Sequence, residues 1–392
     1  MNMNSLIPTY ARKDISFVKG HGAWLWDDNN EKYLDALSGI AVCGLGHAHP
    51  GLADTIARQA ASLLHTSNLY RIPQQEQLGD KLCAITAMDK VFFANSGAEA
   101  NEAAIKLARL HGHANNSNSP AIIVFHNSFH GRTMATLSAT GNSAAHKGYD
   151  PLVPGFIHAP YDDLEAVEQL CQQHPDISAI FAEPVQGEGG IRVPSADFIP
   201  GLRALCDKYN LLLMLDEVQS GNARTGQWFA FQHSAITPDV LTTAKGLGNG
   251  MPIGACLVQH KARELFAPGA HGSTFGGNPL ACAVALEVIN RIEQDALLPH
   301  VQQLGDYLLS QFKQALSGHH LVKEVRGLGL MLGIELKQPC PELVDRALAK
   351  KLLLNVTAGS VIRLLPPLII NQDQADRIIA TVCACIQELD HK

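Results

Sequence analysis

Short apolar segments alternate with segments of helical periodicity between about residues 91 and 256. This alternation is typical of a mostly parallel β-sheet covered by helices on both faces. Helices are expected at 99–111, where apolar residues recur every three or four positions, and at 198–209. The apolar runs predict strands at 91–94, 121–125, 179–182, 211–215, 240–243 and 253–258.

The two ends of the chain follow other patterns. Near the start, two apolar segments flank the Asp/Asn-rich stretch 27–30, which predicts a β-hairpin. After Pro279 a long helical pattern runs to about Leu316, followed by strand-like runs at 329–336 and 361–365, a helix near 341–353 and a last helix. We therefore expect an N-terminal segment (1–50) that packs with a small domain, a large α/β domain (51–285) and a smaller C-terminal α/β domain (286–392).

Composition narrows the class of protein. With 392 residues, 46% hydrophobic and 17% charged, the chain suits a compact protein of more than one domain. The formal net charge of -7, without a Lys/Arg cluster, argues against a nucleic-acid partner. No apolar run reaches the roughly 20 residues of a membrane helix, and the start lacks a signal-peptide pattern. Nine scattered cysteines without a CxxC pair suit a reducing compartment, so we expect a soluble cytoplasmic protein with small-molecule ligands.

A helix start suited to phosphate follows the first of these strands. Gly97 and Ala98 open the helix, and the first N–H groups of a helix have no partner within it. The same stretch also fits an ordinary capping box, with Ser96 at the N-cap and Glu99 three residues later. The residues alone leave both interpretations open.

Asp216 follows five consecutive apolar residues and should reach the crevice at the carboxyl end of the sheet, where ligands bind. An unpaired carboxylate there would be costly, so Asp216 needs a cationic partner. A protonated pyridine nitrogen is one candidate. The alternative is the Walker-B carboxylate of a phosphate-loop NTPase, which requires Gly-Lys-Ser/Thr. No lysine of this chain is followed by Ser or Thr, which disfavours the NTPase.

Lys245 stands between the apolar run 240–243 and the glycine-rich stretch 246–250. Partial burial would lower the pKa of its amine and give the neutral form that condenses with an aldehyde. Lysine, carboxylate and phosphate-ready helix start together predict a Schiff-base cofactor that carries a phosphate. Phe129 and Arg132 add an aromatic ring and a guanidinium for a carboxylate. The glycines do not match GxGxxG and HExxH is absent, so we expect neither a dinucleotide nor a metal.

Seven stretches of this sequence resemble the class III aminotransferases of fold type I, and among them the acetylornithine aminotransferases. The resemblance runs nearly end to end. It implies a fold type I transferase with a mostly parallel central sheet in the large domain, which would bind pyridoxal 5'-phosphate. The matching stretches are 45–50, 95–102, 129–132, 183–190, 216–219, 244–248 and 271–279.

The resemblance also implies roles for single residues. Lys245 would hold the cofactor as an imine and then move the proton between substrate and cofactor, while Asp216 would pair with the pyridine nitrogen. The neighbouring subunit would complete the site, so a homodimer with a shared active site is implied. The other implied cofactor contacts are ring packing by Phe129 and Val218, Gln219 beside the phenolic oxygen, and phosphate binding by Gly97, Ala98 and the neighbouring subunit's Thr274.

The implied reaction moves the ω-amino group of N2-acetyl-L-ornithine to 2-oxoglutarate, giving N-acetylglutamate 5-semialdehyde and L-glutamate. Arg132 would bind the carboxylate distant from the reacting amine, and Arg363 the α-carboxylate of glutamate. Glu188 would pair with Arg363 when the acylornithine is bound, and Ser273 would reach the substrate of the neighbouring subunit. Succinylornithine, ornithine and N-acyl-diaminopimelate remain alternative substrates.

Four residues depart from the pattern of the family. Ala98 often appears as Thr, Asn222-Ala223 replaces a pair that usually contains glycine, and Asn249 stands where glycine is common. We expect these departures to affect loop geometry more than chemistry. Ile40 occupies a place where relatives acting on free ornithine carry tyrosine, which favours an acylated substrate.

Overall fold

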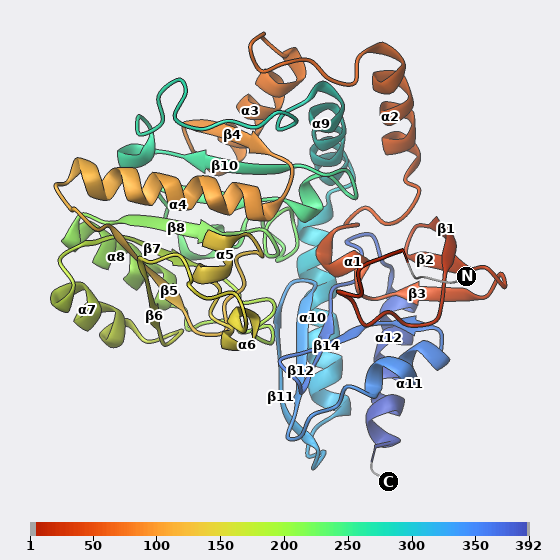
Figure 1. The fold of residues 1–392 in the computed structure, drawn as a ribbon. Helices are drawn as coiled ribbons and strands as arrows, with labels where there is room; N and C mark the ends of the chain where they lie inside the picture. Colours follow the sequence, from red (N-terminus) through yellow and green to blue (C-terminus); the bar gives the residue numbers. More distant parts are fainter. Residues whose placement is uncertain (1–4, 390–392) are drawn as a thin grey trace.

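The computed structural model describes residues 5–389 and contains three β-sheets with helices packed around them (Figure 1). The largest sheet has the strand order β4-β10-β9-β8-β7-β5-β6. Only β10 runs antiparallel to its neighbours in this sheet, so the sheet is mostly parallel, as the sequence predicts. Its strands are β4 (Lys90–Ala94), β5 (Ala121–Phe125), β6 (Phe156–Ala159), β7 (Ile177–Ala182), β8 (Leu212–Asp216), β9 (Val240–Thr243) and β10 (Gly254–Val258).

All six strands predicted for this sheet are confirmed, with bounds that differ by at most two residues. The sequence analysis missed β6, a four-residue edge strand that is only half-buried and that includes His158. A short strand with one covered face carries no continuous apolar run.

Helices cover both faces of the large sheet. Along β8, Leu212 and Met214 pack with the apolar side chains of α4 (Gly97–Ala114), whereas Leu213 and Leu215 pack on the opposite face. This alternation follows from the period of two along a strand. The helices that supply the opposite face are α3 (Pro73–Thr86), α7 (Leu164–Gln173), α8 (Phe198–Tyr209) and α9 (Pro279–Gln294).

A second, antiparallel sheet has the order β11-β12-β15-β14. Its β11 and β14 were missed, because charged and half-exposed residues interrupt the apolar pattern of β11 and β14 has only three residues, two of them half-buried. The strands are β11 (Val322–Leu328), β12 (Met331–Leu336), β14 (Asn355–Thr357) and β15 (Val361–Leu364), and the helices beside them are α10 (Leu297–Ala315), α11 (Leu343–Ala349) and α12 (Gln372–Gln387).

The third sheet joins the two ends of the chain. Strands β2 (Trp24–Asp27) and β3 (Lys32–Asp35) form the predicted hairpin, and the mostly exposed β1 (Phe17–His21) adds a strand that the sequence analysis missed. On the other edge, β3 pairs in parallel with β13 (Leu352–Leu353).

The remaining short elements connect these units. They are α1 (Ser38–Ala41), α2 (Pro50–Ser62), α5 (Met134–Ala139), α6 (Ser143–His146) and the 3₁₀ turns η1 (Ala230–Ser234), η2 (Lys245–Leu247) and η3 (His260–Ala262). Within residues 5–389, no helix has the length and apolar character needed to span a bilayer.

The helical pattern after Pro279 is two helices rather than a continuous one. They meet at Ala296, whose φ of +48° is incompatible with a right-handed helix. The division of the chain at 50 and 285 stays a prediction, and the second of these positions falls inside α9.

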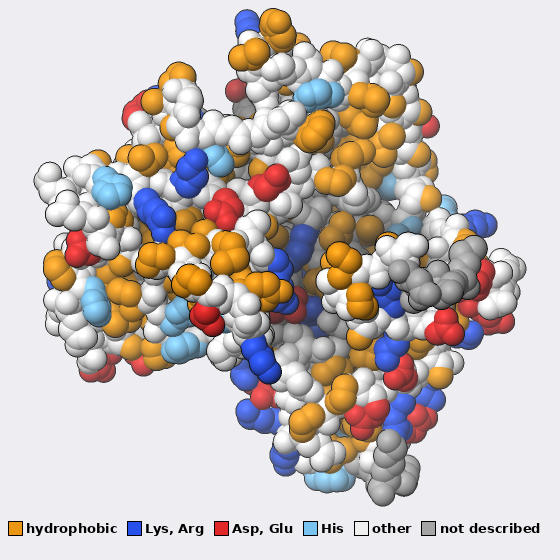
Figure 2. Space-filling view, viewed as in Figure 1, with side chains coloured by type: hydrophobic (Ala, Val, Ile, Leu, Met, Phe, Trp, Pro, Cys, Tyr) orange, Lys and Arg blue, Asp and Glu red, His pale blue; other side chains and the backbone are white. Residues whose placement is uncertain are grey.

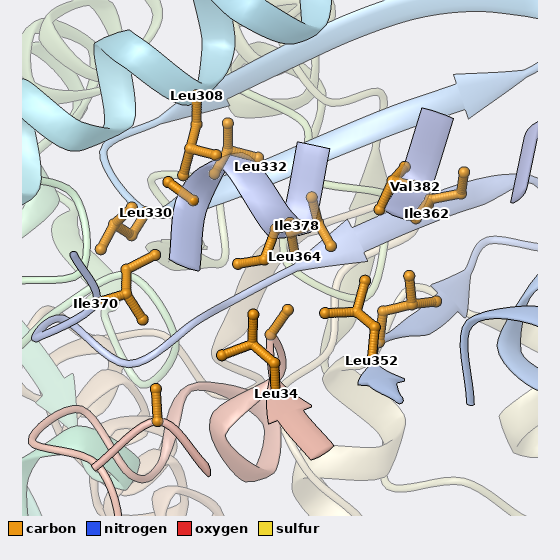
Figure 3. Close-up of a cluster of buried hydrophobic side chains, with 14 of the residues drawn as sticks. Leu34, Leu308, Leu330, Leu332, Leu352, Ile362, Leu364, Ile370, Ile378 and Val382 are labelled. Carbon is orange, nitrogen blue, oxygen red and sulfur yellow. The ribbon is translucent and has the colours of Figure 1, made fainter. Parts of the chain in front are cut away.

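A common hydrophobic core links the N-terminal strands to the C-terminal sheet. Leu34 of β3 is fully buried there, close to Leu352 of β13 and Leu364 of β15, under side chains of α10 and α12 such as Leu308 and Ile378 (Figure 3). The N-terminal segment is therefore held by apolar packing as well as by strand pairing.

We expect Leu34→Ala to lower the free energy of unfolding by about 3 kcal/mol, because it removes fully buried methyl groups and leaves a cavity. Urea unfolding followed by circular dichroism measures the change. The control Val18→Ala alters a β1 side chain that is 68% exposed and should change the value by less than about 0.5 kcal/mol. Equal midpoints for Leu34→Ala and wild type would contradict the role of this contact.

Candidate active site

A cavity of about 390 Å³ lies at the carboxyl ends of β4, β8 and β9. The space-filling view shows this face of the molecule hollowed near its centre, with Lys and Arg side chains inside the hollow (Figure 2). Eight of the twelve residues expected in the site line the cavity: Gly97, Ala98, Phe129, Arg132, Asp216, Val218, Gln219 and Lys245.

Strand pairing brings Lys245 and Asp216 to the same cavity. Asp216 is the last residue of β8 and pairs in register with Thr242 of the parallel strand β9. Lys245 follows Thr242 by three residues, at the first position of η2. Burial lowers the pKa of the Lys245 amine, although the carboxylates of Glu188 and Asp216 oppose the shift.

The carboxylate of Asp216 is buried and held by three donors. Its Oδ2 accepts hydrogen bonds from His130 Nδ1 and Asn101 Nδ2, each at 2.8 Å, and its Oδ1 accepts one from the Val218 N–H at 3.0 Å. Asn101 is fixed in turn, because its Oδ1 accepts from the hydroxyl of Thr242 at 2.6 Å. The second lone pair of Oδ1 can accept a hydrogen bond from a cationic N–H group in the cavity.

His130 is supported by its surroundings. Its ring stacks on Phe181 with centroids 4.2 Å apart, and its Nε2 is buried without a protein partner. Because Nδ1 must donate to the carboxylate, this ring orients Asp216 at the wall of the cavity, which both residues line. The sequence analysis assigned no role to His130 or Asn101. A polar residue among the small apolar positions of α4 was the available signal for Asn101.

The start of α4 has a serine cap and free N–H groups, but no complete capping box. Ser96 Oγ accepts from the Glu99 N–H at 3.2 Å, whereas the Glu99 carboxylate accepts from the N–H of Asn95 at 2.6 Å and not from that of Ser96. The N–H groups of Gly97 and Ala98 precede the first intrahelical bond and border the cavity. A Cβ on Gly97 would lie 2.7 Å from Val218 Cγ1, so only glycine keeps the space beside these N–H groups open.

Glu183 is a buried carboxyl group that the sequence analysis used only as part of a motif. Its oxygens accept from the N–H groups of Phe129 (3.1 Å) and Gly187 (3.2 Å), and the residue lines the cavity. Burial raises the pKa of Glu183, and the negative charge of Asp216 raises it further.

Arg363 and Glu188 form an ion pair next to the cavity. Arg363 is fully buried and its Nη1 lies 2.5 Å from Glu188 Oε1, while its Nε donates to Asn355 Oδ1 at 3.0 Å. Nη1 also lies 3.4 Å from Oε1 of the cavity-lining Gln219. Nη2 of Arg363 is buried without a protein partner, which leaves a donor for a carboxylate.

Ser273 and Thr274 do not line the cavity within this chain. Ser273 Oγ accepts from the Gly276 N–H at 2.9 Å, and the side chain of Thr274 is exposed. Arg132 is also exposed, at the mouth of the cavity, with its guanidinium 5.5 Å from the centre of the Phe129 ring.

The cavity therefore fits a planar cofactor with three chemical groups. The free N–H groups at the start of α4 suit a phosphate. Oδ1 of Asp216 suits a protonated ring nitrogen, and the amine of Lys245, with its lowered pKa, suits an aldehyde. These donors and acceptors match pyridoxal phosphate.

Comparison with known proteins agrees with this chemistry. The family model described as Aminotransferase class-III matches residues 9–386. The acetylornithine aminotransferase of Nitrosomonas europaea is 53% identical over 384 residues, 98% of each chain. The acetylornithine aminotransferase of Aquifex aeolicus is 47% identical, and the alignment covers 97% of this chain and 99% of that protein.

Solved structures agree with the fold. The ornithine aminotransferase of Toxoplasma gondii superposes with a TM-score of 0.95 at 32% identity, covering 99% of this chain and 94% of its own. The acetylornithine aminotransferase of Elizabethkingia anophelis gives a TM-score of 0.87 at 33% identity, with coverages of 98% and 97%. The predicted α/β fold class is confirmed. The chain belongs to the class III aminotransferases and is a transaminase that depends on pyridoxal phosphate.

Proposed function

We propose that this transaminase moves the ω-amino group of N2-acetyl-L-ornithine to 2-oxoglutarate, in arginine biosynthesis. The observation that carries the proposal is the shared cavity of Lys245 and Asp216 beside the Arg363–Glu188 ion pair. Relatives named acetylornithine aminotransferase, at 43–53% identity, support the substrate.

Bound pyridoxal phosphate supplies an aldehyde for the amine and a ring that accepts electron density. Lys245 acts as nucleophile and base. Its lowered pKa leaves more of the amine neutral at working pH, so Nζ would be able to condense with an aldehyde, with release of water, and to take a proton at the reacting substrate carbon. Asp216, held by His130 and Asn101, would pair with the ring nitrogen.

Arg132 and Arg363 would distinguish the substrates by where each substrate carries its carboxylate. Arg132, at the mouth, would bind the carboxylate distant from the reacting amine. Arg363 would bind the α-carboxylate of glutamate after Glu188 releases it. The side chain of Glu188 is 37% exposed and therefore has room to turn away, whereas Arg363 is fixed by Asn355.

We further propose a cytoplasmic homodimer in which Ser273 and Thr274 complete the neighbouring site. Support comes from the exposed Thr274 and from large exposed apolar residues around it. Phe275 is 60% exposed, and Leu69 and Tyr70 belong to the connection before α3. Apolar side chains of this size gathered near a site are typical of a surface that another chain covers.

We expect the purified protein, supplied with pyridoxal phosphate, to show a visible absorbance band that borohydride removes. Lys245→Ala should lack this band and lose kcat by about 10³-fold or more, since it removes the nucleophile and the base together. Absorbance spectra and single-turnover assays measure both effects. A Lys245→Ala protein that keeps the band would refute the assignment of this lysine.

Arg363→Ala should slow the half-reaction with glutamate about 10- to 100-fold and the half-reaction with acetylornithine much less. The reason is that only glutamate places a carboxylate on this guanidinium. Stopped-flow measurement of each half-reaction tests the difference. Arg132→Ala is the matched comparison and should slow both half-reactions; equal losses in Arg363→Ala would reject the switch.

Paired assays of acetylornithine, succinylornithine and ornithine, each with 2-oxoglutarate, test the substrate. We expect the highest kcat/KM with acetylornithine, since Ile40 stands where ornithine-specific relatives carry tyrosine. A preference for ornithine would overturn the proposed substrate while leaving the transaminase chemistry in place.

A further inference from the structure

The peptide that precedes Lys245 is held by the side chain of Asn222, from the loop after β8. Asn222 is buried, and its Nδ2 donates to Thr243 Oγ1 at 2.9 Å and to the Ala244 carbonyl oxygen at 3.2 Å. The Ala244 carbonyl belongs to the peptide bond that leads into Lys245. A Cβ on Gly246 would lie 3.1 Å from Asn222 Cβ, so Asn222 also packs closely on the turn that follows the lysine.

The other end of the same segment is held by Asn249. Its Oδ1 accepts from the Leu45 N–H at 2.7 Å, and its Nδ2 donates to the Gly46 carbonyl oxygen at 3.1 Å. These two bonds tie the glycine-rich turn after Lys245 to the N-terminal segment. Val42, three residues before Leu45, lines the active-site cavity, so this bridge also borders the site.

Backbone geometry explains why asparagine stands at both places. Asn222 has φ +56° and Asn249 has φ +46°, which is the left-handed region that favours glycine. Among residues with a side chain, asparagine tolerates this region best. Glycine would adopt the same backbone, but it would supply none of the four side-chain hydrogen bonds.

Lys245 itself has φ +42°, which is uncommon for a residue with a long side chain. Such a conformation persists only where the surroundings hold it. Asn222 binds the two residues before Lys245, and Asn249, four residues after it, ties the segment to Leu45 and Gly46, so the two carboxamides supply that restraint from both sides.

We propose that Asn222 and Asn249 are positioning residues that hold the segment 243–250 at both ends and so fix the backbone of Lys245 under the cofactor. The inference rests on the proposed function, because it assumes that Lys245 carries pyridoxal phosphate. The asparagines themselves need not touch the cofactor; they act through the lysine.

The test replaces each asparagine by glycine, which keeps the left-handed backbone and removes the hydrogen bonds. Asn222→Gly and Asn249→Gly should each lose pyridoxal phosphate from the holoenzyme about fivefold faster, and the double variant about 25-fold faster. The kcat should fall by similar factors with KM nearly unchanged, and the melting temperature of the apoenzyme should stay within about 2 °C of wild type. Cofactor loss is followed by absorbance after rapid dilution.

Asn210→Gly is the matched control. Asn210 has φ +55° but is exposed at the C-terminal end of α8, before β8 and therefore at the opposite edge of the sheet from the site. It should release the cofactor at the wild-type rate. If Asn222→Gly does not fold, Asn222→Asp decides. Asn222→Asp keeps the size of the side chain but places an acceptor opposite the Ala244 carbonyl oxygen. Pyridoxal phosphate should therefore be lost more than fivefold faster than from wild type.

The outcomes separate the two levels of the inference. A wild-type holoenzyme without the visible band overturns the proposed function and this inference together. A normal wild type whose glycine variants release the cofactor within twofold of the wild-type rate overturns the positioning role alone. So does a variant whose apoenzyme melts lower while its cofactor loss is unchanged, because the asparagine then has only a structural role.

Discussion

The site depends on one constraint, the burial of the Asp216 carboxylate at the end of a central strand. A buried charge is tolerated only when hydrogen bonds and a counter-charge replace the lost water. His130, Asn101 and the Val218 N–H provide the bonds. Two further buried carboxyl groups, Glu183 and Glu217, lie near Asp216; burial raises the pKa of both, that of Glu217 to about 7, and the charge of Asp216 raises them further. A cationic ring at Asp216 would supply the counter-charge that this region needs.

The order of strands in the large sheet converts this constraint into a complete site. Strands β8 and β9 are neighbours, so their parallel pairing places Asp216 and Lys245 at the same edge. The N–H groups suited to a phosphate stand at the start of α4, directly after β4, which lies two places beyond β9 in the sheet. From there α4 runs back across the sheet and brings Asn101 against Asp216. The single antiparallel strand, β10, lies between β4 and β9.

The sequence predicted the buried parts of this arrangement best. Apolar runs marked six of the seven strands of the large sheet, and the polar residues that end them marked Asp216 and Lys245. Strands with an exposed face, such as β6, lacked a run and were missed. His130 and Asn101 were missed for another reason, because their role is set by a partner 86 and 115 residues away. Sequence periodicity reports which face is buried and says nothing about which distant group a polar side chain meets.

Left-handed backbone positions explain how distant segments are joined at the site. Residues 38–41 form a left-handed turn, and Ile40 there has φ +66°, which is unusual for a β-branched residue. Arg224 holds this region, because its buried guanidinium donates to the carbonyl oxygens of Leu330 (3.1 Å) and Pro366 and lies 3.5 Å from Ser38 Oγ. Burial lowers the pKa of Arg224 to about 9, opposed by nearby Asp35. One cation thus connects the loop after β8, the C-terminal sheet and the N-terminal turn. Strained turns and a buried cation are costly for stability, so this junction persists only because the hydrogen bonds of Arg224 and the surrounding packing hold it.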